Sequence, residues 1–155
     1  MPTPQAPPQP LTELKLPPAL KKLVNSALAR GKLISVGYVS ESGRPELSFR
    51  GSVQAFSDTQ LAIWVRSPTG GLVDAIAKHP HIALLYGDLD PATRAFLTFH
   101  GRGRIDNSPA TRRIVYSSSN EQERERDKEQ KGVPLIIDLD TVDGFFDGTP
   151  VKMRR

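Results

Sequence analysis

Short segments with strand-like alternation, joined by even shorter turns, constrain the fold of this 155-residue chain more than any other feature. Residues 95–105 alternate along an extended chain. One side carries Leu97, Phe99, Gly101, Gly103 and Ile105, and the other carries Phe96, Thr98, His100, Arg102 and Arg104. Sequential strands with tight turns pair antiparallel. We predict six strands, at residues 33–40, 46–56, 61–66, 82–86, 95–105 and 133–146.

Helices are predicted at the periphery of these strands. Residues 17–30 begin with two prolines, repeat apolar residues with helical spacing and end at Gly31. Residues 72–79 form a short second helix, and Ser108 followed by Pro109 opens a third. Residues 121–131 mix acidic and basic side chains, which indicates a solvated, mobile helical face. Because alternating β-α-β units are absent, the elements predict a closed or nearly closed antiparallel barrel of the mainly β, α+β class.

One domain is expected, over residues 17–155, preceded by a disordered proline-rich arm at residues 1–16. The arm holds five of the 14 prolines and offers almost nothing to bury. The chain has no cysteine, which excludes disulfides, thiol nucleophiles and Cys-ligated metals. No signal peptide or membrane span is found, so we expect a cytoplasmic protein without a membrane partner. The net charge of +4 is scattered, so no nucleic-acid partner is expected.

Residues 45–80 contain the chemistry of an anion site. Arg50 lies on one predicted strand, Arg66 ends the next strand, and Gly70 and Gly71 precede the short helix. Guanidinium groups and the free amides of a helix start are the groups that capture a phosphate. Two simpler interpretations stay open: Arg50 pairs with a cross-strand carboxylate, and the glycines form only a turn. Trp64 is interpreted as a core or dimer-interface aromatic residue.

The order of these elements resembles the FMN-binding split β-barrel superfamily, which includes pyridoxamine 5′-phosphate oxidases, flavin reductases and deazaflavin-dependent reductases. The resemblance covers most of residues 18–146. It rests on Arg50 in the second strand, on Leu-Ala-Ile-Trp-Val at 61–65, and on the helix end Ile-Ala-Lys-His-Pro at 76–80 before an apolar strand. It implies a six-stranded antiparallel split barrel, a bound FMN or alternatively a deazaflavin, and a homodimer in which both subunits contribute to the cofactor site.

The chain departs from the oxidases within the site. They carry a Ser-Arg-Lys triplet at the start of the helix, where this chain has Gly70, Gly71 and Leu72. Pyridoxamine phosphate oxidation is therefore not expected, and Arg66 is interpreted as the compensating cation. The resemblance implies that the cofactor is bound by Arg50, Ser52, Val65, Arg66, Ser67, Thr69, Gly70 and Gly71.

No catalytic residue or metal site is assigned, because the chain shows no dyad, nucleophile motif or metal-ligand spacing. A flavin performs hydride chemistry itself, so few catalytic side chains are needed. The leading hypothesis is a flavin-dependent oxidoreductase acting on an unidentified small-molecule substrate. The alternative is a non-enzymatic flavin-binding, ligand-binding or stress-associated protein on the same barrel. A homodimer would cover apolar residues such as Phe145 and Phe146.

Overall fold

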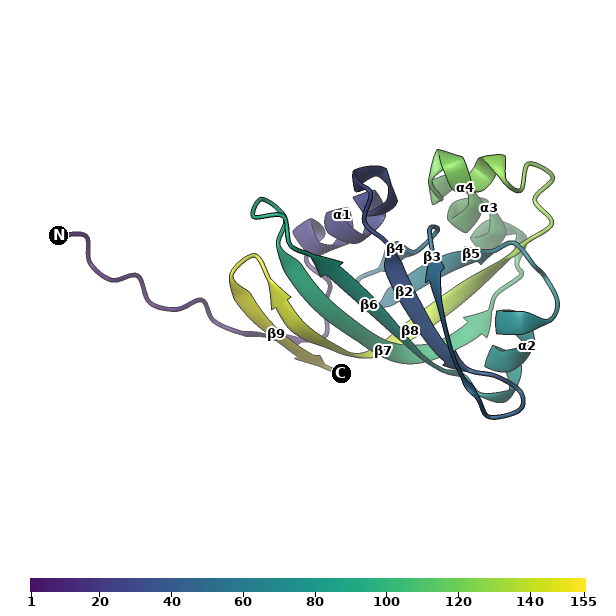
Figure 1. The fold of residues 1–155 in the computed structure, drawn as a ribbon, viewed down its shortest axis with the longest axis horizontal. Helices are drawn as coiled ribbons and strands as arrows, with labels where there is room; N and C mark the ends of the chain where they lie inside the picture. The colour runs from purple at the N-terminus through teal and green to yellow at the C-terminus, as the bar shows by residue number, and fades with distance from the viewer.

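One nine-stranded sheet with helices at its periphery forms the structure, a computed structural model that describes residues 1–155 (Figure 1). The helices are α1 (Pro18–Ser26), α2 (Gly71–Lys78), α3 (Pro109–Ser118) and α4 (Glu121–Glu125), and a 3-10 turn, η1 (Leu28–Arg30), follows α1. The strands are β1 (Leu11–Glu13), β2 (Ile34–Val39), β3 (Pro45–Arg50), β4 (Gln54–Ser57), β5 (Gln60–Val65), β6 (His81–Asp88), β7 (Ala95–Ile105), β8 (Val133–Phe146) and β9 (Thr149–Arg154). None of the helices is both long enough and apolar enough to cross a bilayer.

The long strand β8 organises the sheet. It pairs along one edge with β7, and along its other edge first with β5 and then with β9. The order continues from β7 through β6 and β2 to β3, while β4 pairs with β5. Only residues 51–53 separate β3 from β4. This segment therefore connects two strands that lie at opposite edges of the sheet.

The predicted α+β split-barrel class is confirmed, with two corrections to its details. The sheet is not closed, because β3 pairs with β2 and β4 pairs with β5, but no ladder joins β3 to β5. The predicted second strand is split into β3 and β4, and the short strands β1 and β9 were not predicted. These two strands form the only parallel pair, which depends on residues at opposite ends of the chain.

Alternation in the strands generates the core as expected. On β7 the side chains of Ala95, Leu97 and Phe99 are buried, and those of Phe96 and His100 on the other side are exposed. Burying one large apolar side chain contributes roughly 2 kcal/mol. Most of the buried apolar residues therefore join one cluster inside the curved sheet. A smaller cluster, made of Ala62, Trp64, Val115 and Ile136, lies outside the sheet beneath α3.

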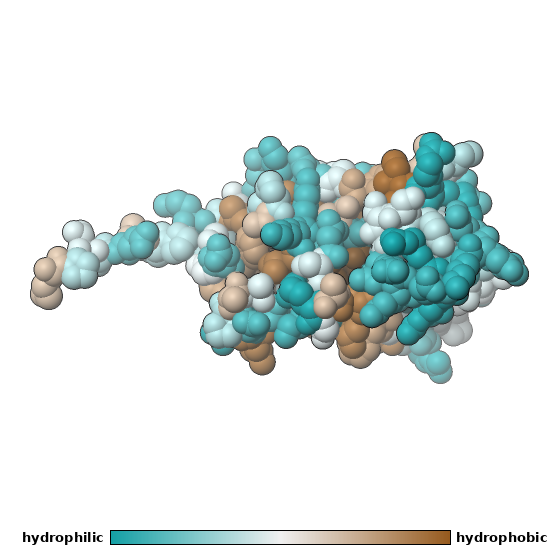
Figure 2. Space-filling view, turned by 90° about the horizontal axis from the view of Figure 1, so that it is seen from above, coloured by the Kyte–Doolittle hydropathy of each residue, from teal (hydrophilic) through white to brown (hydrophobic).

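The end of the predicted N-terminal arm belongs to the fold. Leu14 and Leu16 are only 7% and 1% exposed and join the main core, and β1 pairs with β9 just before them. These two leucines therefore belong to the fold and not to the predicted arm at residues 1–16. Their polar and proline-rich neighbours gave no sign in the sequence that their apolar surface would be buried. Residues 1–10 carry no regular secondary structure and project away from the body (Figures 1 and 2).

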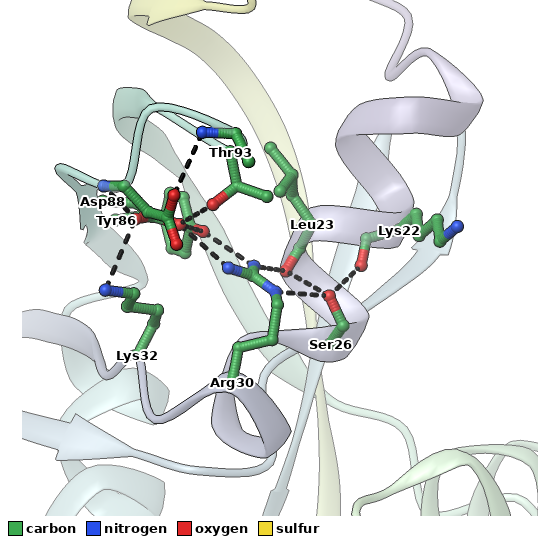
Figure 3. A network of polar contacts seen from close by, with 10 residues as sticks. Lys22, Leu23, Ser26, Arg30, Lys32, Tyr86, Asp88 and Thr93 are labelled. Carbon is green, nitrogen blue, oxygen red and sulfur yellow. Dashed lines mark hydrogen bonds and ion pairs between the residues drawn. The ribbon is translucent and has the colours of Figure 1, made fainter.

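A buried acidic group fastens the α1–η1 segment to the end of the barrel (Figure 3). The carboxylate of Asp88, whose side chain is fully buried, accepts hydrogen bonds from Arg30 at 2.9 Å, Tyr86 at 3.0 Å and Thr93 at 2.7 Å. Lys32 contributes a second cation at 3.4 Å. Burial alone would raise the pKa of Asp88, but these hydrogen bonds outweigh it and hold the pKa well below its usual range.

The Asp88 network is expected to be a main contributor to stability. Asp88→Asn should lower the free energy of unfolding by at least about 2 kcal/mol, because it leaves two cations without their buried partner. Since the pKa is depressed in the folded state, the carboxylate stabilises the fold above the ordinary aspartate pKa of about 3.9 and loses this effect as the pH falls. The difference between wild type and variant should therefore narrow below pH of about 4.

Urea unfolding at several pH values measures this difference. The control is Glu129→Gln, which removes an exposed carboxylate in the same way and should change stability by less than about 0.5 kcal/mol. Equal stabilities for both variants would show that the Asp88 network does not hold the fold.

Candidate functional site

A cavity of about 250 Å³ lies where the ends of β3 and β5 meet residues 121–127, which comprise α4 and the two residues after it and which we call the α4 segment. We call it the arginine pocket, because Arg50, Arg66 and Arg126 line it. The remaining lining residues are Leu28, Leu33, Phe49, Gly51, Ser52, Trp64, Gln122 and Glu123. The pocket therefore combines cations from three separate elements with an apolar rim.

The three arginines of the pocket have no carboxylate partner. Arg50 makes a single side-chain hydrogen bond, from Nε to the Ser48 hydroxyl at 3.2 Å, and Arg66 and Arg126 make none. The fold pairs most of its other arginines with carboxylates or backbone carbonyls, in contacts made by Arg30, Arg44, Arg102, Arg104, Arg112, Arg124, Arg154 and Arg155. The predicted alternative for Arg50, a cross-strand ion pair, is thus absent.

Ser52 and Val65 have roles inside the fold. Ser52 is buried, and its hydroxyl donates to the Trp64 carbonyl at 2.9 Å and accepts from the Trp64 amide at 3.1 Å. A serine has a single O–H donor, so Ser52 has no proton left for a ligand in this arrangement. Val65 is a core residue at the end of β5 and does not line the pocket. Both residues position Arg50 and Arg66 by fixing the strands that carry them.

The remaining predicted residues lie outside the pocket. Ser67 and Thr69 are exposed, and the turn leads away from the pocket after Arg66. Gly70 and Gly71 have φ angles of 73° and 45°, a left-handed conformation that favours glycine, and Gly71 begins α2. The structure brings Arg50, Ser52 and Arg66 together, but it does not place the glycine turn beside them. The assignment of this turn to a cofactor stays a prediction.

The charged segment predicted as a mobile face is instead anchored to the sheet. Asp127 is buried, and its carboxylate accepts from Trp64 Nε1 at 2.9 Å and from the amides of Lys131 at 3.0 Å and Gly132 at 2.9 Å. Burial opposes ionisation of Asp127, but these hydrogen bonds and the nearby charge of Arg66 lower its pKa. Asp127 is therefore a carboxylate that holds the residue before it, Arg126, over the pocket.

The arrangement suits an anion better than acid–base chemistry. Three guanidinium groups and the carboxylate of Glu123 line the pocket, so the lining side chains carry a net charge of +2 (three minus one). Guanidinium groups without protein partners can donate charge-assisted hydrogen bonds to phosphate oxygens. The lining contains no histidine, cysteine or tyrosine, so Glu123 is its one side chain that could transfer a proton, and no cluster of metal-ligating side chains occurs in the structure.

Sequence reasoning missed Glu123, Arg126 and Asp127. The mixed charges of residues 121–131 resemble an ordinary solvated helix, although Glu125 and Lys128 are the only oppositely charged pair at i, i+3 spacing in this segment that forms an ion pair. The one available signal was a single aspartate followed five residues later by Gly132. That spacing does not reveal a buried Trp64 partner 63 residues away.

The fold is shared with several proteins of known structure, although the sequence itself has no close match. The sequence matches no protein-family model and no curated protein. The structure is similar to the crystal structure of HupZ from Group A Streptococcus, with 18% identity, a TM-score of 0.63, and coverage of 84% of this chain and 94% of that chain. It is also similar to General Stress Protein 26 from Bacillus anthracis, with 17% identity, a TM-score of 0.62, and coverage of 88% of this chain and 98% of that chain.

A third similar structure is a pyridoxamine 5′-phosphate oxidase-related, FMN-binding protein from Nostoc punctiforme, with 18% identity and a TM-score of 0.58. The match covers 78% of this chain and 77% of that chain. At these identities the likeness concerns the fold. The chain thus has the split-barrel fold of the pyridoxamine 5′-phosphate oxidase-like proteins, and the resemblance noted in its sequence is confirmed at that level.

The anchor at Asp127 can be tested through Trp64, the only tryptophan of the chain. Asp127→Ala should lower the free energy of unfolding by about 2 kcal/mol, because it leaves the indole N–H and two amides without an acceptor. The Trp64 emission should shift to the red as water reaches the ring. Fluorescence-monitored unfolding measures both effects. Glu125→Ala, an exposed neighbour on α4, is the control and should leave the emission unchanged; an unaltered spectrum for Asp127→Ala would contradict the anchor.

Proposed function

We propose that the protein binds FMN, or a related flavin, with the phosphate in the arginine pocket. The observation that carries this proposal is the meeting of Arg50 and Arg66 in one cavity without a carboxylate partner. A phosphate monoester carries about two negative charges at neutral pH, which matches the net charge of the pocket lining. The FMN-binding description of one similar structure supports the choice of ligand.

The size of the pocket fits part of such a ligand. At about 250 Å³ the cavity is below the range of roughly 300–1,000 Å³ that encloses a whole drug-sized ligand. It can hold a phosphate and the chain attached to it, but not a flavin ring as well. Phe49 and Leu33 on the rim are 65% and 47% exposed and offer an apolar surface beside the cavity. A deazaflavin with a phosphate in its side chain would meet the same groups.

The proposed activity is a redox reaction on a small-molecule substrate. A bound flavin supplies hydride transfer, and the protein contributes binding, orientation and the exclusion of water. Glu123 is the one side chain of the pocket lining that could transfer a proton, which agrees with a site that needs few catalytic groups of its own. The second candidate is a non-enzymatic flavin-binding or stress-associated protein, which the similarity to General Stress Protein 26 favours. Reduction of the bound flavin by a nicotinamide donor, followed by reoxidation with an added acceptor, would separate the two.

A second copy of the chain is the proposed partner. Leu47 and Phe49 on β3 are 76% and 65% exposed, and Leu85 on β6 lies in the same row as Phe49, because both pair with Ser35. With Leu33 and Phe96 these side chains form what we call the apolar outer face. A contiguous exposed apolar surface of this kind marks an interface. Phe145, 36% exposed, pairs with Phe96, whereas Phe146 joins the core and is unavailable to a partner.

Binding of FMN should depend on Arg50. Arg50→Gln is expected to weaken FMN binding at least about tenfold, because it removes a charged donor to the phosphate. Binding of riboflavin, which lacks the phosphate, should change little between wild type and variant. Quenching of Trp64 fluorescence measures both affinities, because Trp64 lines the pocket. Arg113→Gln, which removes an exposed arginine outside the pocket, is the control; wild type that binds neither flavin would refute the proposal.

The proposed dimer should depend on the apolar outer face. Phe49→Asp should convert a dimer at micromolar concentration into a monomer, because a charge would then be buried without a partner. Leu89→Asp is the control, since Leu89 is 68% exposed on the turn after β6 and lies outside this face. Sedimentation velocity measures the mass of each variant. Wild type that sediments as a monomer would exclude a cofactor site shared between two subunits.

A further inference from the structure

The α4 segment carries two charged side chains to the arginine pocket on the side opposite the strands. Glu123 and Arg126 lie three residues apart, and both line the cavity. Glu123 reaches the pocket because Gly51 has no side chain: a Cβ at that position would collide with the Glu123 carboxylate. The Glu123 carboxylate therefore lies directly against the backbone of Gly51 between β3 and β4.

The backbone that carries Arg126 is fixed from several directions. Tyr116 donates a hydrogen bond from its hydroxyl to the Asp127 carbonyl at 3.1 Å, next to the buried Asp127 carboxylate. Arg124 donates to the Ser117 carbonyl at 3.1 Å, and Arg112 donates to the Gln130 carbonyl at 2.7 Å. These contacts tie the segment to α3 and to β5 on both sides of Arg126. A short helix that would be marginal in isolation is thereby held in one position.

Other charges of residues 121–131 are already paired. Lys128 forms an ion pair with Glu125 at 3.2 Å, and Lys131 forms one with Glu129 at 2.8 Å. Arg126 and Glu123 form no ion pair with each other or with any other residue, although both border a cavity that holds two more arginines. Figure 2 shows that hydrophilic side chains dominate the surface over α3 and α4, in keeping with a charged wall at this end of the molecule.

We propose that the α4 segment forms a third wall of the ligand site, next to the two walls that the ends of β3 and β5 provide. Arg126 donates to the ligand phosphate from the side facing Arg50 and Arg66, and Glu123 determines how much negative charge the pocket accepts. A monoester dianion balances three arginines and one glutamate. A diphosphate brings additional charge, and if it extends toward Gly51 it meets the Glu123 carboxylate, which repels it. The pocket thus selects a phosphate monoester over a diphosphate, an inference that rests on the proposed flavin function for its biological ligand.

The test uses inorganic phosphate and pyrophosphate as probes, with FMN as a separate arm. Isothermal titration calorimetry on the full chain measures the affinity of each probe for wild type, Arg126→Gln and Glu123→Gln. Arg113→Gln and Glu121→Gln are the matched controls, because both residues are exposed, lie on α3 or α4, and do not line the pocket.

Arg126→Gln should weaken phosphate binding at least about tenfold, the effect of losing one charged donor. Glu123→Gln should strengthen pyrophosphate binding by a larger factor than it strengthens phosphate binding, because pyrophosphate carries more charge. Both controls should bind as wild type does. Unchanged phosphate affinity in Arg126→Gln, or equal effects of Glu123→Gln on the two probes, would overturn the inference.

The FMN arm separates this inference from the proposed function. If wild type binds phosphate and loses it in Arg126→Gln, but does not bind FMN, the third wall stands and the flavin proposal fails. If FMN binds to wild type and to Arg126→Gln with the same affinity, the flavin proposal stands and the third wall fails. Wild type that binds none of the probes would reject both.

Discussion

The link between the Ser52 side chain and the Trp64 backbone is the contact on which the candidate site depends. The sheet is open, so no ladder connects β3 with β5, yet the two strands must meet for Arg50 and Arg66 to share a cavity. One hydroxyl satisfies both the amide and the carbonyl of Trp64 and replaces two ladder hydrogen bonds at this point. Residues 51–53 can therefore turn from one end of the sheet to the other while the ends of the strands stay together.

Two buried aspartates fasten separate helices to the barrel by the same physical means. Asp88 holds the α1–η1 segment, and Asp127 holds the segment that follows α3. Each carboxylate is removed from water, but each accepts several hydrogen bonds, and in both cases these lower the pKa against the effect of burial. Buried charges that are fully hydrogen-bonded specify one arrangement of the surrounding elements, because any displacement leaves several groups unsatisfied. The position of α4 over the pocket follows from this constraint.

The arginines of the pocket differ from most other arginines of the fold in having no carboxylate partner. Arg30 and Arg112 donate to groups inside the fold, whereas the arginines of the pocket make only one side-chain hydrogen bond, from Arg50 to Ser48. Three arginines and one glutamate leave the pocket with excess positive charge, which is unfavourable unless a ligand supplies the opposite charge. The pocket of this split barrel is therefore suited to an anionic ligand.

The sequence by itself determined the local elements and their class. Alternation predicted the inner and outer faces of β7, capping residues predicted the start of α3 at Ser108, and the order of elements predicted the split barrel. Such patterns depend on neighbours within a few residues, which is why they can be read without a structure. Arg50 and Arg66 were found for the same reason, because Arg50 ends one strand and Arg66 comes directly after another.

Only the tertiary structure decided which distant groups meet. It placed Leu14 and Leu16 in the core, kept the Gly70–Gly71 turn away from Arg50, and joined Asp127 to Trp64. These outcomes depend on which strand ends and loops come together in space, and residues separated by a large part of the chain carry no local signal of that contact. The charged segment was therefore interpreted as a mobile surface, although burial of a single aspartate makes it a wall of the pocket.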